Sequence, residues 1–132
     1  MRILIVEDDL LSRKFLEGVL GSFGELAHAE NGLLAIEAVR AAHAEGKPFD
    51  LICLDIMMPE MDGQQALEEI RRLERELDVH PKQEVKVIMT TALNDPKSVV
   101  RAYYKGGATA YLHKPIDKEA MVDTMRRLGL IP

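Results

Sequence analysis

Short apolar segments alternate with longer segments of helical periodicity along the whole chain. The short segments are rich in β-branched and other apolar residues, which is typical of strands buried on both faces of a sheet. Five such strands are expected, at Arg2–Val6, Glu25–Ala29, Asp50–Asp55, Val85–Thr90 and Thr109–His113. Each strand is followed by a segment long enough for one helix, so the pattern predicts five strand–helix units.

The expected helices carry apolar residues at intervals of three and four positions, which places these residues on one helix face. Glu74–Glu84 lacks this period and contains Pro81, so we expect it to hold the fraying end of the third helix and a polar loop. The apolar stripes of the first three helices, which we expect to face the core, are Leu11, Phe15, Val19 and Leu20, then Ala35, Ile36, Val39 and Ala42, then Ala66, Leu67, Ile70 and Leu73.

Short polar residues stand where the helices begin, and their side chains can accept hydrogen bonds from the first free backbone N–H groups. We expect Asp9 to cap the first helix, and Asp62 to cap the third in a capping box with Gln65. The other expected helix starts are Asn31 for the second helix, Asp95 with Pro96 for the fourth and Asp117 for the fifth.

The alternation of strands and helices predicts the fold class. Parallel strands need crossover connections, and right-handed crossovers lay helices against both faces of the sheet. We therefore expect a doubly wound α/β fold with five parallel strands and five helices. The chain has 132 residues, of which 47% are hydrophobic and 30% charged, and this composition suits one globular domain over residues 1–132.

Charge and cysteine content narrow the class of protein. The net charge of -5 offers no general attraction to nucleic acid, so we expect no direct nucleic-acid partner. The apolar start of the chain reaches Glu7 too soon for a signal peptide, and we expect no membrane insertion and a cytoplasmic protein. Cys53 is the single cysteine, so a disulfide is excluded and a buried structural thiol is expected.

Polar residues end four of the apolar strands. Ligands of such sheets collect beyond the carboxyl ends of the strands, so these residues are the candidates for chemistry. Glu7 and Asp8 follow the first strand, Asp55 ends the third, Thr90 and Thr91 stand at the end of the fourth, and Lys114 follows the fifth. Three carboxylates in one crevice repel each other unless a cation lies among them, and an all-oxygen set of this size suits Mg²⁺. The charges of Mg²⁺ and Lys114 together balance those of the three carboxylates.

Four motifs in this order resemble the receiver domains of two-component signalling, which the stand-alone chemotaxis response regulators typify. They are the acidic first-strand signature Ile3–Asp9, the loop Leu54–Gly63 around Asp55, the pair Thr91-Ala92 and the pair Lys114-Pro115. The resemblance spans nearly the whole chain. It implies a flavodoxin-like strand order of 2-1-3-4-5.

The resemblance implies a role for each site residue. Asp55 is the nucleophile that takes a phosphoryl group from a phosphohistidine, beside Mg²⁺. Asp8 binds the metal directly and Glu7 largely through water, and the backbone carbonyl of Met57 supplies a further oxygen. Lys114 contacts a phosphoryl oxygen as a positive charge. The peptide bond before Pro115 is expected to be cis, as in the family.

The resemblance also implies a switch. The Thr91 hydroxyl binds the phosphoryl group, and Tyr111 then moves inward and reshapes the surface of the fourth helix, fifth strand and fifth helix, where downstream partners bind. Thr90 remains an alternative to Thr91, because an error of one residue in strand register exchanges the two. Tyr111 remains open to a second interpretation, an ordinary half-buried strand aromatic.

The implied partners are a sensor histidine kinase or a histidine phosphotransfer protein upstream, and an output protein downstream. We expect a monomer or a weak dimer that forms on phosphorylation. The protein would be a phosphoacceptor rather than an enzyme for other substrates, although it catalyses its own phosphorylation and slow dephosphorylation. Met57 and Leu93, each two residues beyond a site residue, are apolar where polar groups would position a hydrolytic water, so we expect a long-lived phosphorylated state.

Three departures from the family pattern are visible: Glu7 in place of the more frequent aspartate, a longer segment between Gly63 and Val85, and the apolar residues named above. Other functions fit less well. A flavodoxin-like cofactor carrier would need a phosphate loop where the acidic residues stand. A phosphatase of the haloacid dehalogenase type would need an aspartate at Met57. A degenerate receiver acting only as an interaction module is the remaining alternative, and the complete acidic set disfavours it.

Overall fold

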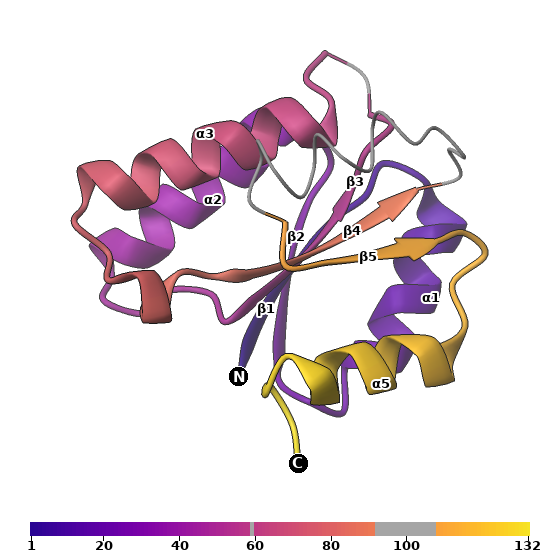
Figure 1. Ribbon diagram of the computed structural model, residues 1–132. Helices are drawn as coiled ribbons and strands as arrows, with labels where there is room; N and C mark the ends of the chain where they lie inside the picture. The colour runs from indigo at the N-terminus through magenta and orange to yellow at the C-terminus, as the bar shows by residue number, and fades with distance from the viewer. Residues whose placement is uncertain (59, 92–107) are drawn as a thin grey trace.

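The computed structural model describes residues 1–58, 60–91 and 108–132. Strands and helices alternate along the chain (Figure 1). The elements are β1 (Arg2–Val6), α1 (Leu10–Leu20), β2 (Glu25–Ala29), α2 (Gly32–Ala44), β3 (Leu51–Asp55), α3 (Gly63–Glu76), the 3₁₀ helix η1 (Pro81–Gln83), β4 (Lys86–Thr91), β5 (Ala110–His113) and α5 (Lys118–Arg127).

The five strands form one parallel sheet in the order β2-β1-β3-β4-β5. The predicted doubly wound α/β class and the 2-1-3-4-5 order are therefore confirmed. The β4 strand ends at Thr91, one residue later than expected. The expected fourth helix at Asp95 and Pro96 lies outside the described residues, so the structure describes four of the five predicted α-helices.

Helices cover both faces of the sheet, with α2 and α3 on one face and α1 and α5 on the other (Figure 1). Side chains alternate between the faces along each strand, which divides the buried apolar residues into two clusters. Leu54 and Met89 belong to the cluster under α2 and α3, and Cys53 and Ile88 to the cluster under α1 and α5. Burial raises the pKa of the Cys53 thiol to about 12, as expected for a structural cysteine. None of the helices in the described ranges is long and apolar enough to cross a membrane.

The expected helix caps are present. Asp9 and Asn31 accept hydrogen bonds from the backbone N–H groups of Ser12 and Leu34, both at 2.9 Å. Asp62 accepts from Gln65 N–H at 2.8 Å, and the Gln65 side chain accepts from Asp62 N–H at 3.1 Å, which completes the predicted capping box. Asp117 caps α5.

The expectation for the apolar stripe of α1 was wrong at two positions. Val19 and Leu20 are buried, but Leu11 is 79% and Phe15 43% exposed, and Leu16 takes their place in the core. Helical spacing allows either edge of the stripe to face the sheet, and the packing of α1 decides which one does. The exposed edge, Leu11 and Phe15, lines a cavity next to the carboxyl ends of the strands.

The end of α3 also differs from its prediction. Glu74, expected in a fraying polar end, is only 2% exposed. One of its oxygens accepts from Arg71 at 2.6 Å and the other from the backbone N–H of Val85 at 2.8 Å. These bonds hold the third helix, which runs to Glu76, against the residue before β4. The polar character of Glu74 did not indicate its burial, because its carboxylate accepts a hydrogen bond from the backbone N–H of Val85, 11 positions away.

Candidate functional site

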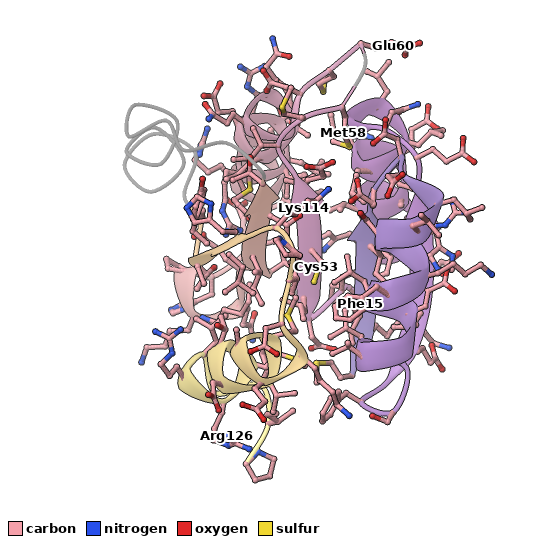
Figure 2. All side chains as sticks on the ribbon, turned by 90° about the vertical axis from the view of Figure 1, so that its right-hand side faces the viewer. Phe15, Cys53, Met58, Glu60, Lys114 and Arg126 are labelled. Atoms are coloured by element: carbon pink, nitrogen blue, oxygen red, sulfur yellow. The ribbon has the colours of Figure 1, made fainter. Side chains whose placement is uncertain are left out.

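The candidate site residues meet at the carboxyl ends of the central strands. Glu7 directly follows β1, Asp55 is the last residue of β3, and Lys114 directly follows β5. Although both side chains are ionisable, Glu7 and Asp55 are only 1% and 4% exposed. Figure 2 shows Lys114 above Cys53, with Met58 and Glu60 farther out at the same end of the molecule and Arg126 at the opposite end.

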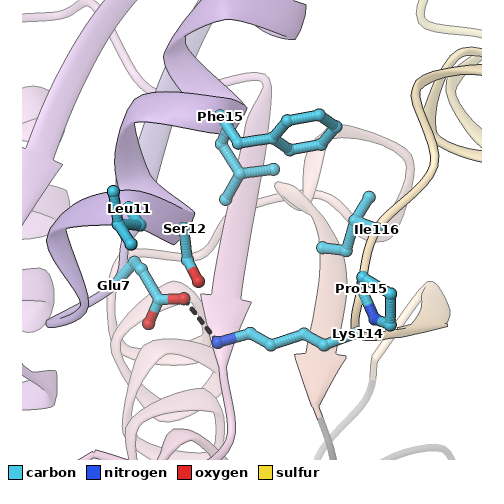
Figure 3. A pocket seen from close by; sticks show the side chains of 8 residues that line it. Glu7, Leu11, Ser12, Phe15, Lys114, Pro115 and Ile116 are labelled. Carbon is cyan, nitrogen blue, oxygen red and sulfur yellow. Dashed lines mark hydrogen bonds and ion pairs between the residues drawn. The ribbon is translucent and has the colours of Figure 1, made fainter.

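Lys114 joins the two buried carboxylates. Its Nζ lies 2.5 Å from Glu7 Oε1 and 3.3 Å from Asp55 Oδ2. The contact with Glu7 is drawn in Figure 3. The sequence therefore placed the lysine and both carboxylates correctly in one cluster, and the structure adds that the shorter contact is to Glu7.

Glu7, Asp8 and Asp55 form a set that fits a divalent cation. Each offers one carboxylate oxygen, and these oxygens lie within 4.8 Å of one another. The second oxygen of Glu7, Oε2, is buried and receives no hydrogen bond from the residues that the structure describes. A buried carboxylate oxygen without a partner is costly, and a hard cation would satisfy it. Asp8 is exposed and gives the crevice an open side.

The proximity of the charges shifts their pKa values. Burial, and then the hydrogen bond and negative charge of Glu7, raise the pKa of Asp55 to about 7, although Lys114 acts in the opposite direction. Burial also tends to raise the pKa of Glu7, but hydrogen bonds with Asp55 and Lys114 and the charge of Lys114 outweigh it, so the pKa of Glu7 is lowered. Burial tends to lower the pKa of Lys114, but the two carboxylates raise it overall. Without a metal, the pair of carboxylates can retain a proton near neutral pH.

The loop after β3 fixes the position of Asp55. Its Oδ1 accepts from the Met57 backbone N–H at 3.2 Å, and the Gly63 N–H donates to Ile56 O at 2.8 Å. A Cβ at Gly63 would lie 2.2 Å from the backbone oxygen of Asp55, so only glycine permits this approach. The backbone of Met57 thus lies beside the Asp55 carboxylate, while its side chain is 59% exposed.

Strand register separates the two threonines. Thr90 is paired with Asp55, whereas Thr91 lies two residues beyond Met89, which is paired with Tyr111. Residues two apart face the same side of a sheet, so Thr91 and Tyr111 share the face that carries α2 and α3, and Thr90 lies on the other. Thr91 and Thr90 are both buried, and Tyr111 is half-buried against the cluster under α2 and α3.

The junction after β5 brings Lys114 to the site. Its backbone N–H donates to Thr91 O at 2.8 Å, which ties Lys114 to the end of β4. The peptide bond between Lys114 and Pro115 is cis, as expected.

The chain matches the model of the response regulator receiver domain over residues 3–126. It belongs to this family. The receiver domain is 32% identical over 128 residues to the chemotaxis protein CheY of Bacillus subtilis, covering 96% of this chain and 95% of that protein. It is also 36% identical over 124 residues to the transcriptional regulatory protein ZraR of Klebsiella oxytoca, where it covers 93% of this chain but only 25% of the relative.

Solved structures agree with this assignment. The receiver domain of the histidine kinase CKI1 from Arabidopsis thaliana, as a mutant, superimposes with a TM-score of 0.81 at 28% identity, covering 97% of this chain and 89% of that one. A complex of CheX with CheY, BeF₃ and Mg²⁺ from Borrelia burgdorferi gives a TM-score of 0.84 at 25% identity, with 98% and 89% covered. The chain is therefore a receiver domain of two-component signalling.

The sequence did not single out the cavity beside the receiver site. This cavity of about 300 Å³ lies between α1 and the segment after β5 and has Glu7 and Lys114 in its wall (Figure 3). Its other lining residues are Leu11, Ser12, Phe15, Leu16, Pro115 and Ile116. Leu11 and Phe15 could have indicated this cavity, but their helical spacing predicts a place in the core for both residues.

Proposed function

We propose that this receiver domain accepts a phosphoryl group on Asp55 from a phosphohistidine of a sensor histidine kinase or a histidine phosphotransfer protein. One observation carries the proposal: a buried aspartate at a strand end lies within 3.3 Å of a lysine ammonium and beside two further carboxylates suited to a cation. In the reaction, an Asp55 oxygen forms a bond to phosphorus as the N–P bond of the phosphohistidine breaks. The electron pair of the N–P bond stays on the imidazole nitrogen.

The metal implied by this site is Mg²⁺. Glu7, Asp8, Asp55 and the backbone carbonyl of Met57 would hold it, and the grouped carboxylate oxygens with the unsatisfied Oε2 of Glu7 support that fit. When bound, Mg²⁺ supplies positive charge that favours ionised Asp55 and offsets the charge of the incoming phosphoryl group.

The residues of the chain provide alignment and charge. Phosphoryl transfer needs little else from a protein, because its transition state spreads negative charge over the oxygens of the transferred group. Lys114 would bind one of these oxygens, and the Thr91 hydroxyl another. The Met57 N–H holds Oδ1 of Asp55 in place.

Output would follow from Thr91 and Tyr111. The shared face of these residues supports a switch in which Thr91 moves towards the phosphoryl group and Tyr111 turns inward. The affected surface would comprise the expected fourth helix, which lies outside the described residues, together with β5 and α5. A downstream protein would bind there. We propose a cytoplasmic monomer or a weak dimer that forms on phosphorylation.

The decisive experiment is phosphorylation of Asp55→Asn with a radiolabelled phosphohistidine donor in Mg²⁺. Wild type should take up label and Asp55→Asn none, because the amide is not a nucleophile while its volume is unchanged. Asp62→Asn is a matched control in the same segment. Asparagine also caps helices, so this variant should fold and retain full labelling.

Stable label on another residue of Asp55→Asn would refute the nucleophile assignment. Absence of label on folded wild type, with a downstream partner still bound, would instead favour the degenerate receiver. Circular dichroism of each variant separates loss of chemistry from loss of fold.

A further inference from the structure

We infer that Glu7 is a positioning residue for Lys114: its carboxylate holds the lysine ammonium in the metal-free protein and releases it when a divalent cation takes Glu7. Lys114 is then free to meet a phosphoryl oxygen. This inference rests on the proposed function, and it adds an order of events, cation first and lysine second.

The contacts of Lys114 are unequal, and this asymmetry is the first support. Nζ lies 2.5 Å from Glu7 Oε1 but 3.3 Å from Asp55 Oδ2. Hydrogen bonds from an ammonium to a carboxylate usually measure about 2.7–2.9 Å, so the contact with Glu7 is shorter than this range and the contact with Asp55 is longer. In the metal-free protein the Lys114 ammonium therefore binds mainly to Glu7, and only weakly to Asp55, the proposed phosphoryl acceptor.

Glu7 faces two cation positions at once. Its Oε1 carries Lys114, while Oε2 is buried without a hydrogen bond from the described residues. The same carboxylate belongs to the group with Asp8 and Asp55 whose oxygens lie within 4.8 Å of one another. A divalent cation at that group and the ammonium of Lys114 thus compete for one carboxylate, because each lowers the negative charge available to the other.

The surroundings strengthen this ion pair. Figure 3 shows Glu7 and Lys114 at one side of the cavity, with Phe15 and Ile116 farther along its wall. Glu7 is 1% exposed and the Lys114 side chain 23%. Apolar neighbours and little water reduce screening, so the pair is worth more here than on an open surface.

The length of Glu7 makes the contact possible. Aspartate at this position has one methylene fewer, which withdraws the carboxylate by about 1.5 Å. Glu7→Asp retains the negative charge for the cation but should lose the short contact with Lys114. Glutamate in place of the more frequent aspartate would then have a specific effect: the longer side chain binds Lys114 in the metal-free protein.

The test is a double-mutant cycle for Mg²⁺ affinity, measured by calorimetry on wild type, Glu7→Asp, Lys114→Met and the double variant. Removing Lys114 should tighten Mg²⁺ binding at least tenfold when residue 7 is glutamate, and less than about twofold when it is aspartate. Lys118→Met controls for the loss of one positive charge at an exposed position of α5 and should change affinity less than twofold in either background.

A second readout follows the lysine directly. The ¹⁵Nζ resonance of Lys114, identified by its absence in Lys114→Met, should move when Mg²⁺ is added to wild type and move less than half as far in Glu7→Asp. No phosphoryl donor is present, so neither measurement depends on activity.

Equal tightening by Lys114→Met in both backgrounds would overturn the inference. If wild type still accepts a phosphoryl group on Asp55 in that case, the proposed function stands and only the role of Glu7 is lost. Failure of all four proteins to bind Mg²⁺ would overturn the metal site and this inference together.

Discussion

Glu7 and Glu74 are both buried glutamates that contact a cation, yet their surroundings differ. Glu74 is 2% exposed, and each of its oxygens accepts a hydrogen bond, one from Arg71 and one from Val85 N–H. Glu7 is 1% exposed, and its Oε1 accepts from Lys114 while its buried Oε2 receives no hydrogen bond from the described residues. A satisfied buried charge fixes the fold, whereas an unsatisfied one is costly unless a ligand completes it. The difference separates a structural ion pair from a candidate binding site.

The largest effect is expected from Glu74→Ala. This change removes the 2.6 Å partner of buried Arg71 and the acceptor of Val85 N–H, so the free energy of unfolding should fall by about 3–5 kcal/mol. Glu69→Ala is the matched control, because its 3.1 Å pair with Arg72 lies on the same helix but is exposed, and it should cost less than about 1 kcal/mol. Urea denaturation measures both. Equal losses would show that Glu74 is not the anchor that its contacts indicate.

Metal addition should act on the Glu7 cluster and leave the Glu74 pair unaffected. At a Mg²⁺ concentration a hundredfold above Kd, wild type should gain about 2.7 kcal/mol in free energy of unfolding, since the folded state binds the ion preferentially. Asp8→Ala should abolish this gain. Asp9→Ala should keep it while losing about 1 kcal/mol from the cap of α1. Thermal denaturation with and without Mg²⁺ provides the measurement, and an unchanged gain in Asp8→Ala contradicts the site.

The metal-free protein should become less stable as pH rises towards neutrality. The pKa of Asp55 is about 7 in the folded protein against an ordinary value of 3.8. Between these values the folded state keeps a proton that the unfolded state has lost. Stability should therefore fall by about 1.4 kcal/mol per pH unit within this window and level off above about pH 7.

The lowered pKa of Glu7 has the opposite sign and acts below its ordinary value of 4.5, where stability is lost as pH falls. Unfolding measured from pH 5 to 8 therefore excludes the contribution of Glu7. Asp55→Asn should lack the decline. A decline of the same slope in that variant would assign the effect to another group.

The smallest expected effect concerns the lifetime of the phosphorylated protein. Met57 is 59% exposed at the edge of the site and offers no polar group to align water, and Leu93, outside the described residues, is assigned the same role by sequence. Met57→Asn combined with Leu93→Glu should speed loss of the phosphoryl group by up to about tenfold, or about 1.4 kcal/mol in activation free energy. Decay in Mg²⁺ at matched folding stability tests this. Unchanged decay would rule out shielding by these side chains.

Local sequence patterns predicted much of the fold because their causes are local. Apolar strands, capping residues such as Asp62 and the alternation of elements each depend on a few neighbouring residues. The same patterns failed for Phe15, because the width of an apolar stripe does not say which edge meets the sheet. They also failed for Glu74, because its partner Val85 belongs to the other end of a connection.

By itself, the sequence determined which residues gather at the strand ends, since parallel strands bring Glu7, Asp55 and Lys114 to one edge once their order is fixed. Only the tertiary structure decided how they touch. The short contact of Lys114 with Glu7 depends on the distances from β1 across β3 and β4 to β5 and on the length of one side chain, and so does the lack of a hydrogen bond to Oε2 from the described residues. Those distances arise from packing, and the order of residues along the chain does not contain them.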